Sequence, residues 1–213
     1  MHLFLAKSRA FGIGLICLAS AMVAGLTTAA TASTLDFDNV APDFDPIPDG
    51  YGGLHWSNFL ASFDDGGYFP TSGYYTGIVS GDFVAYNGYA EPADISSDVP
   101  FNLDSGYFTA AWNDGLIIAA AGYRNGALLH RTAFIVNTEG PYLKVFDWRG
   151  VDEVHFESFG GFDAGTGAFG THFVVDNLSV SMTPIPSSLL TFGTALVGLM
   201  YLRSTRRKRV TAA

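Results

Sequence analysis

Hydrophobic positions in the middle of the chain recur in short runs and not with a helical period. Runs rich in β-branched and aromatic residues occupy residues 134–136, 142–146, 151–156 and 173–180, and each is bounded by Gly, Asp, Asn or Pro. Runs spaced about 8–14 residues apart are typical of antiparallel strands, and no stretch shows a sustained 3.6-residue apolar period. The pattern therefore predicts an all-β fold, an antiparallel β-sandwich over residues 33–182.

Two local features refine this prediction. Apolar runs at residues 116–123 and 127–135 flank Asn125-Gly126, and Asn-Gly supplies the positive φ values of a tight hairpin turn. Residues 42–81 are instead rich in Gly, Pro, Asp and aromatic residues. We expect that stretch to be mostly ordered loop with one or two short strands.

The first 32 residues have the layout of a signal peptide. Lys7 and Arg9 provide a basic start, residues 11–26 form an uncharged apolar run, and Ala-Thr-Ala at residues 30–32 is a small-x-small cleavage site. Signal peptidase is therefore an expected partner, and the mature chain is expected to begin near residue 33.

A second uncharged apolar run lies near the C-terminus. Residues 185–202, as a helix, span ~27 Å at about 1.5 Å per residue, which is just enough for the core of a bilayer. The following residues 203–209 include five basic side chains. By the positive-inside rule this basic tail lies in the cytoplasm and the middle domain lies outside. An ordinary single-span membrane anchor is the alternative to a sorting segment.

Charge separates the middle of the chain from its ends. Residues 33–183 contain all 20 acidic residues but only 4 basic ones, so their formal charge is −16, against −9 for the whole chain. Such a balance repels nucleic acid and favours solubility or cation binding. The only cysteine, Cys17, lies inside the signal peptide, so the mature chain would contain no disulfide.

The C-terminal arrangement resembles that of PEP-CTERM proteins, in particular variants with a V-P-x-P-type motif. These share a signal peptide, a proline motif, a short apolar helix and a terminal arginine cluster. The resemblance implies that residues 183–213 are a sorting segment processed by exosortase, in Gram-negative bacteria that make exopolysaccharide. The matching positions are Pro184, Ile185, Pro186, Arg206, Arg207, Lys208 and Arg209.

The middle of the chain is also similar to a β-sandwich domain found in many PEP-CTERM proteins. That domain begins with an Asp-Phe-Asp strand, contains a Gly-Tyr-Gly-Gly-Leu-x-Trp segment and ends on a Phe-x-x-Asp-Asn strand. Here these are residues 36–38, 50–56 and 173–177. The resemblance implies a jelly-roll-like sandwich, similar in shape to carbohydrate-binding domains.

Three carboxylates are candidate calcium ligands. Strand alternation places Asp36 and Asp38 on one face, and it places Asp176 on the apolar face of its strand, with Val174 and Leu178. A buried carboxylate must be hydrogen-bonded or bound to a cation. If the first and last strands are neighbours, the three acids could converge on Ca²⁺. The alternative is that Asp176 accepts backbone N–H groups of residues 51–56.

A second set of titratable residues lies on one predicted strand. Alternation puts Glu153, His155 and Glu157 on the same face, and carboxylates two residues apart along a strand are roughly 6–7 Å apart. This falls within the range of glycosidase acid pairs, but one strand rarely supplies both acids, because they must flank a bond. A solvated outer face is the favoured interpretation.

Aromatic residues gather in the loop-rich region, at Tyr51, Trp56, Tyr68, Phe69, Tyr74, Tyr75, Tyr86 and Tyr89. Exposed rings could stack on sugars, with Asp64, Asp65 or Asn87 binding hydroxyls, and Trp56, Tyr74, Tyr75 and Tyr86 are the candidate glycan-binding residues. The alternative is that most of these rings fill the core.

These observations lead to three functional hypotheses. The preferred one is an exported cell-envelope or matrix protein without catalytic activity, which binds extracellular polysaccharide. The second is a polysaccharide-acting enzyme of β-sandwich type, which would need two carboxylates across a cleft. The third is a purely structural matrix protein without a ligand.

Overall fold

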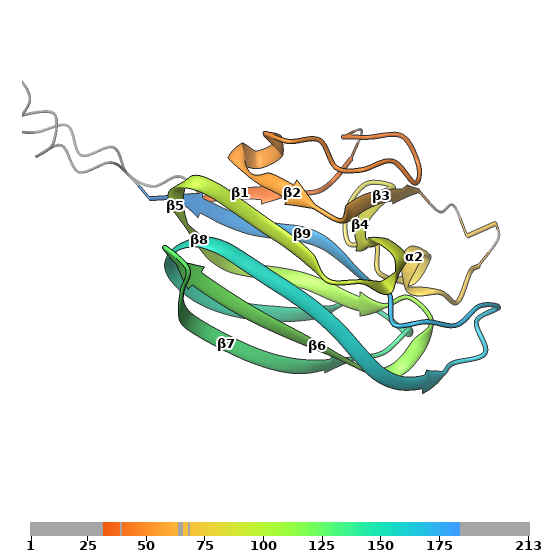
Figure 1. Cartoon of the computed structure of the whole chain (residues 1–213). Coiled ribbons are helices and arrows are strands. Elements are labelled where there is room, and N and C mark those ends of the chain that lie inside the picture. The colour runs from red at the N-terminus through yellow and green to blue at the C-terminus, as the bar shows by residue number, and fades with distance from the viewer. Residues whose placement is uncertain (1–31, 39, 64–65, 68, 184–213) are drawn as a thin grey trace, which may run out of the picture. The chain divides into compact units, whose positions relative to one another are not determined.

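We describe the fold from a computed structural model, in which residues 32–38, 40–63, 66–67 and 69–183 are described (Figure 1). The strands are β1 (Ala32–Leu35), β2 (His55–Ser57), β3 (Phe59–Phe63), β4 (Phe83–Asn87), β5 (Ala93–Ala110), β6 (Asn113–Arg124), β7 (Ala127–Val136), β8 (Tyr142–Asp163) and β9 (Phe173–Met182). The helical turns among these residues are η1 (Tyr51–Gly53), α2 (Gly73–Thr76) and η2 (Gly88–Ala90). The predicted all-β fold is confirmed.

All strand pairs are antiparallel, and they form one sheet in the order β3-β4-β9-β5-β8-β6-β7, with β1 added to β9 and β2 to β5. The sheet folds over on itself. Phe108 of β5 packs against Phe134 of β7 at a ring-centroid distance of 5.2 Å, although β8 and β6 separate these strands in the order. Figure 1 shows β6 and β7 on one side of the sandwich and β1, β9 and β4 on the other. The predicted antiparallel sandwich is therefore confirmed.

The main core lies between these two layers and is rich in phenylalanine. Its centre is a cluster of rings in contact with one another, namely Phe108, Phe134, Phe146, Phe156 and Phe173. Period-2 alternation produces this core: in β6 and β8, residues facing inward are buried and their neighbours are not. Edge-to-face ring pairs add specific contacts to the burial of apolar area.

The predicted hairpin turn is present. Arg124 pairs with Ala127, and the two turn residues have φ values of 49° at Asn125 and 73° at Gly126. Positive φ at both positions matches the twist of the flanking strands, which explains why Asn-Gly occurs here. The prediction for residues 42–81 is also confirmed, because the described residues of this stretch form β2, β3, short helical turns and otherwise loop.

The predicted opening strand at residues 36–38 is wrong. The strand β1 ends at Leu35, and Phe37 has a φ of 61°, which is not an extended conformation. The turn directs the Phe37 ring into the core, where it is fully buried against Tyr51 and Trp56. Burial of this aromatic ring therefore accounts for the break in the strand.

The predicted alternation along β9 is only partly right. The register shifts by one residue between Ser105 and Tyr107 of β5, and Asn177 on the partner strand has a φ of 48°. This bulge changes which face each side chain reaches. Val174 packs into a separate small cluster, whereas Leu178 belongs to the main core. Asp176 therefore lies N-terminal to the bulge and does not share the face of Leu178, contrary to the sequence prediction.

The short helix α2 packs tightly against the end of β5. Ser72 caps the helix: its hydroxyl accepts from the Tyr74 N–H and donates to the Ala111 carbonyl at 2.7 Å. Gly73 is required for the close approach, since a Cβ there would lie 2.1 Å from the Ala110 carbonyl oxygen. These contacts fix the direction of the Tyr74 side chain.

Several predictions concern the two ends of the chain. The signal peptide (residues 1–32, of which only residue 32 is described), the membrane-spanning helix (residues 185–202) and the basic tail lie outside the described residues. Within the described part, no helix has the length and apolar character to cross a bilayer. The described domain belongs to one unit, Ala30–Thr183.

Candidate functional site

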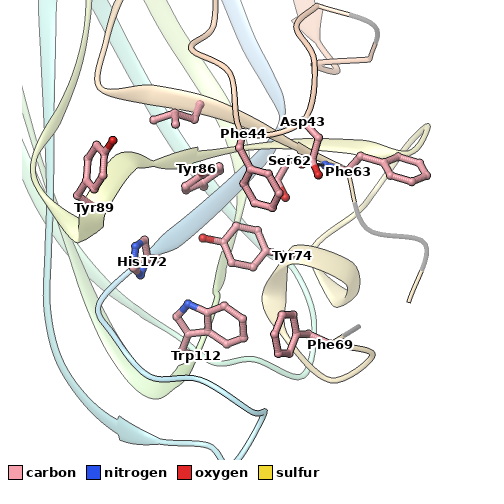
Figure 2. A pocket seen from close by; sticks show the side chains of 11 residues that line it. Asp43, Phe44, Ser62, Phe63, Phe69, Tyr74, Tyr86, Tyr89, Trp112 and His172 are labelled. Atoms are coloured by element: carbon pink, nitrogen blue, oxygen red, sulfur yellow. Dashed lines mark hydrogen bonds between the residues drawn. The ribbon is translucent and has the colours of Figure 1, made fainter. Parts of the chain in front are cut away.

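A pocket of about 900 Å³ opens beside β3 and β4 (Figure 2). Most of its lining side chains are aromatic, and the rest supply a few polar groups. The described residues that line it are Asp43, Phe44, Leu60, Ser62, Phe63, Phe69, Tyr74, Tyr86, Tyr89, Trp112 and His172. Pockets of this size and composition are typical of small-molecule sites.

Strand alternation supplies one wall of the pocket. In β3, Phe59 and Ala61 belong to the main core, and the intervening Leu60 and Ser62 reach the pocket. In β4, Tyr86 likewise points away from the main core. The outer face of these two short strands is therefore the surface on which the pocket is built.

The floor of the pocket is a set of rings from separate segments. Tyr74 comes from α2 and Trp112 from the turn between β5 and β6. The Tyr74 ring makes edge contacts with Tyr86 at 5.1 Å and with Trp112 at 5.3 Å, and Phe69 contacts Trp112 at 5.0 Å. Because each ring supports the next, the floor is a rigid aromatic surface.

Two rings stand at the rim and are open to solvent. Phe44 is 63% exposed and Tyr89 is 84% exposed. Both have positive φ values, 64° and 58° respectively, so local turns hold the rings at the pocket edge. The two rings extend the aromatic surface of the pocket to its rim.

Several polar atoms of the pocket have no partner in the described protein. His172 Nδ1 is buried without a hydrogen bond. Among the side chains drawn in Figure 2, neither the Tyr74 hydroxyl nor the Trp112 indole N–H is hydrogen-bonded. In the same view the Tyr74 hydroxyl is directed toward the side of the pocket occupied by His172. Tyr74 and Trp112 line the pocket and can offer these donors to a ligand, whereas His172 Nδ1 is closed off from solvent.

Burial and charge set the protonation of the pocket. Burial raises the pKa of Tyr74, and it raises the pKa of Tyr86 to about 12, with a further contribution from the negative charge of Asp43. Burial lowers the pKa of His172 below its usual value. At neutral pH the two phenols therefore carry their protons and His172 is uncharged.

Two carboxylates hold the segment that joins α2 to β4. Asp176 accepts from the backbone N–H groups of Val79 at 2.7 Å and Ser80 at 3.0 Å. Asp38 accepts from the N–H groups of Asp82 at 2.9 Å and Phe83 at 3.1 Å. Since Tyr74 precedes this segment and Tyr86 follows it, the two carboxylates position both sides of the pocket floor.

The Asp176 carboxyl is fully buried. Burial raises its pKa to about 6, opposed by the N–H groups of Ser80, Val79 and Asn177, and the charge of Asp38 adds to the rise. The sequence prediction that Asp176 is buried and accepts backbone N–H groups is confirmed. The predicted partner loop is wrong, since the donors come from residues 79–80 and not from residues 51–56.

The three candidate calcium ligands are not brought together as a site. Asp36 accepts from the Tyr51 hydroxyl, whereas Asp38 and Asp176 each bind backbone N–H groups of residues 79–83. In the described ranges, no group of three or more His, Cys, Asp or Glu side chains could hold a metal ion. Hydrogen bonding accounts for the placement of all three carboxylates.

Two of the four predicted glycan-binding residues, Tyr74 and Tyr86, line the pocket. Trp56 does not, because its ring is buried in the main core and its Nε1 donates to the Tyr51 carbonyl at 3.0 Å. Tyr75 is 43% exposed and is not among the residues that line the pocket. The loop aromatics thus divide between the core and the pocket, so each of the two alternative interpretations holds for some of them.

Other pocket residues were missed by the sequence prediction. Trp112 lies in a tight turn and His172 just before β9, both far along the chain from the aromatic loop region. Phe44 and Asp43 lie in that region but were not distinguished from other loop residues. The one usable signal was Phe44, a large apolar side chain inside the predicted loop of residues 42–81.

The second set of titratable residues lies on the outer face, as predicted. Glu153 and Glu157 are exposed, while the intervening Val154 and Phe156 are buried. His155 Nδ1 lies 2.6 Å from Asp94 Oδ1. A separate hollow of about 500 Å³ on β6, β7 and β8 includes His155 and Glu157 in its lining.

The sorting-motif residues lie outside the described part of the chain. The structure therefore places none of the seven positions proposed above, and the sorting motif stays a prediction. The affected residues are Pro184, Ile185, Pro186, Arg206, Arg207, Lys208 and Arg209.

No family model and no curated protein sequence matches the chain. Among solved structures, TmCBM61 in complex with beta-1,4-galactotriose is similar at 9% identity and a TM-score of 0.34, over 68% of this chain and 100% of the other. A DUF4465 family protein from Bacteroides ovatus is similar at 10% identity and a TM-score of 0.37, over 73% of this chain and 96% of the other. The enzymatically active domain of Bacteriophage CBA120 tailspike protein 4 is similar at 7% identity and a TM-score of 0.32, over 66% of this chain and 22% of the other. At TM-scores below 0.5 these matches assign neither a family nor a ligand.

Proposed function

We propose that this protein is a non-catalytic saccharide-binding protein and that the aromatic pocket is its binding site. The observation that carries the proposal is the combination of a ring-lined pocket with unpartnered polar atoms. Tyr74 and Trp112 supply both ring faces and hydrogen-bond donors, and His172 adds a further polar group. Sugars have the same mixed character, since C–H groups form one face of the ring and hydroxyls surround it.

A purely apolar ligand fits this pocket less well. Such a ligand would bury the Tyr74 hydroxyl, the Trp112 N–H and the His172 ring without giving them partners. Each buried polar group left unpaired costs about 1–3 kcal/mol. A saccharide instead supplies hydroxyls that both donate and accept, and it stacks its C–H face on the exposed rim rings Phe44 and Tyr89.

The pocket favours binding over hydrolysis. Glycoside hydrolysis generally uses two carboxyl groups that flank the scissile bond. Among the described lining residues, Asp43 supplies one carboxylate, and one of its oxygens already accepts from the Phe63 N–H at 3.0 Å. An enzyme of β-sandwich type is therefore the second candidate function, and a matrix protein without a ligand is the third.

A glycan array followed by titration calorimetry tests the proposal. We expect a saccharide ligand whose affinity falls about tenfold in Phe44→Ala, equivalent to ~1.4 kcal/mol. Phe162→Ala is the matched control, because Phe162 is 67% exposed and Phe44 is 63% exposed, yet only Phe44 lines the pocket. Absence of any saccharide ligand, or equal losses in the two variants, would reject the proposal.

We also propose that the protein is exported and sorted to the cell surface or matrix. This rests on the signal-peptide layout of residues 1–32 and on the proline motif, apolar run and basic tail of residues 183–213. Mass spectrometry of protein from the envelope fraction should find a mature N-terminus near residue 33. Recovery of the chain with residues 1–32 intact would contradict export by this route.

A further inference from the structure

Asp43 places a negative charge at the mouth of the aromatic pocket. It lies in the segment between β1 and β2, and its Oδ1 accepts from the Phe63 N–H at the end of β3, so the carboxylate is held in one place. Its charge contributes to the raised pKa of Tyr86, which shows that its field reaches the pocket interior. Figure 2 shows Asp43 and His172 at opposite walls of the pocket.

Positive charge lies elsewhere on the domain. The four basic residues of residues 33–183 are all on the long strands, with Arg124 on β6, Arg131 on β7, and Lys144 and Arg149 on β8. Among the described residues, none of the four lines the aromatic pocket. The net charge of the same region is −16, which adds a general repulsion of anions to the local effect of Asp43.

His172 completes the polar character of the pocket without adding charge. Its Nδ1 is buried with no partner among the described residues. Burial lowers its pKa, so the imidazole is neutral at pH 7 and carries no positive charge. A carboxylate on a ligand would therefore gain no ion pair with His172.

We propose that the pocket selects neutral saccharides and rejects uronic acids. The inference rests on the proposed saccharide-binding function and specifies its ligand class. Asp43 is the specificity-determining residue, because its fixed carboxylate repels a second carboxylate and accepts hydrogen bonds from neutral sugar hydroxyls. The Tyr74 hydroxyl and the His172 ring provide the remaining hydrogen bonds to the neutral sugar.

Matched saccharide pairs provide the test. The full-length protein is titrated with trisaccharides of glucose and glucuronic acid, galactose and galacturonic acid, and mannose and mannuronic acid, together with the methyl esters of the three uronides. We expect the best neutral trisaccharide to bind at least about tenfold more tightly than its uronide at low salt. The methyl ester, which lacks the charge, should recover most of the affinity.

Two charge variants separate the local effect from the overall charge. Asp43→Asn keeps an oxygen for the Phe63 N–H but removes the charge. It should remove most of the affinity gap, that is, the difference in affinity between the neutral and acidic members of a pair. Asp98→Asn removes the same charge from a side chain that is 99% exposed and outside the pocket, and it should leave the gap unchanged. Unchanged thermal unfolding of both variants verifies the fold.

Each outcome has a distinct meaning. Equal or tighter binding of uronides to the parent protein overturns the selectivity while leaving saccharide binding in place. If the difference in affinity persists in Asp43→Asn, Asp43 is not the specificity-determining residue. If neither member of any pair binds, the proposed function itself fails, and the selectivity fails with it.

Discussion

The main core and the pocket region are stabilised in different ways. In the main core, rings from β5, β7, β8 and β9 pack directly on one another, and Phe108 alone contacts four other phenylalanine rings. In the pocket region, side-chain oxygens and amides bind the backbone of neighbouring segments. Asp176 and Asp38 bind residues 79–83, and Asn87 accepts from the Phe173 N–H at 2.7 Å.

This difference has a structural reason. The strands of the main core are long, up to 22 residues in β8, and their alternation generates a continuous apolar face. The pocket region is built on strands of 5 residues and a helix of 4, joined by loop segments. Polar side chains accept hydrogen bonds from N–H groups of those segments and hold them in place. Such an arrangement leaves ring faces free for a ligand.

The largest effect is expected in the main core. Phe108→Ala removes a ring that is 1% exposed and in contact with four others, and it leaves a cavity. We expect the free energy of unfolding to fall by about 3–5 kcal/mol. Chemical denaturation measures this change. A loss below about 1 kcal/mol would show that the ring cluster does not dominate the stability of the core.

The next effect is expected at the carboxylate that holds the pocket region. Asp176→Ala leaves the N–H groups of Val79 and Ser80 without their acceptor and should cost about 2–3 kcal/mol. Asp152→Ala is the control, because its side chain is 24% exposed and lies at a surface turn, where it accepts from the Asn125 N–H at 2.7 Å and pairs with Arg124 at 3.9 Å.

Measurements in EDTA and in millimolar Ca²⁺ make this test sharper. Hydrogen bonding predicts the same loss in both buffers, whereas a stabilisation by Ca²⁺ that disappears only in Asp176→Ala would contradict it. An Asp176→Ala variant that unfolds like the parent would contradict the assigned role altogether.

The pH dependence of the same residue gives a smaller effect. The pKa of Asp176 is raised from 3.8 to about 6 on folding, so the folded protein binds the proton more tightly than the unfolded chain does. The contribution of Asp176 to stability is therefore complete below pH 4 and declines as the pH rises through 6. The stability difference between the parent and Asp176→Ala should shrink by on the order of 1–2 kcal/mol between pH 4 and pH 7.5. If the stability difference instead grows between pH 4 and pH 7.5, the pKa of Asp176 is lowered on folding, and its N–H donors outweigh its burial.

The smallest effect is expected at the hairpin turn, far from both regions. Gly126 has a φ of 73°, and no atom lies within 4 Å of the position of a Cβ. Gly126→Ala should therefore cost about 1 kcal/mol through backbone strain alone, without a steric clash. Saccharide affinity should not change. A weaker affinity in this variant would show that the pocket and the hairpin are coupled.

Local sequence signals predicted the strands β6 to β9 but not β5 (Ala93–Ala110), which carries Phe108 at the centre of the main core. The β-branched and aromatic runs became β6 to β9, and Asn125-Gly126 gave the turn between β6 and β7. Two predicted runs, residues 142–146 and 151–156, proved to be parts of the single long strand β8. Glycine at position 150, with a φ of 68°, interrupts the pattern but not the strand. Alternation is a local property, so no knowledge of the whole fold was needed.

The pocket region could not be predicted in the same way. Tyr74, Tyr86, Trp112 and His172 come from four segments, and only the folding of the sheet brings them together. The bulge at Asn177 has no strong sequence signal, yet it places Asp176 and Leu178 on different faces. Trp56 lies in a Gly-rich segment like those of the pocket aromatics, but its ring is buried in the main core. Composition alone does not separate a ring that fills the core from one that lines a pocket.

The indole N–H signals of the three tryptophans test the central claim most directly. Trp112 lines the pocket, whereas Trp56 donates to the Tyr51 carbonyl and Trp148 is buried in the main core. In a titration of ¹⁵N-tryptophan-labelled protein with the best neutral saccharide, we expect the Trp112 signal alone to shift and to saturate at the calorimetric affinity. A saccharide that binds without moving the Trp112 signal, or that moves all three signals alike, would contradict the assignment of this pocket as the binding site.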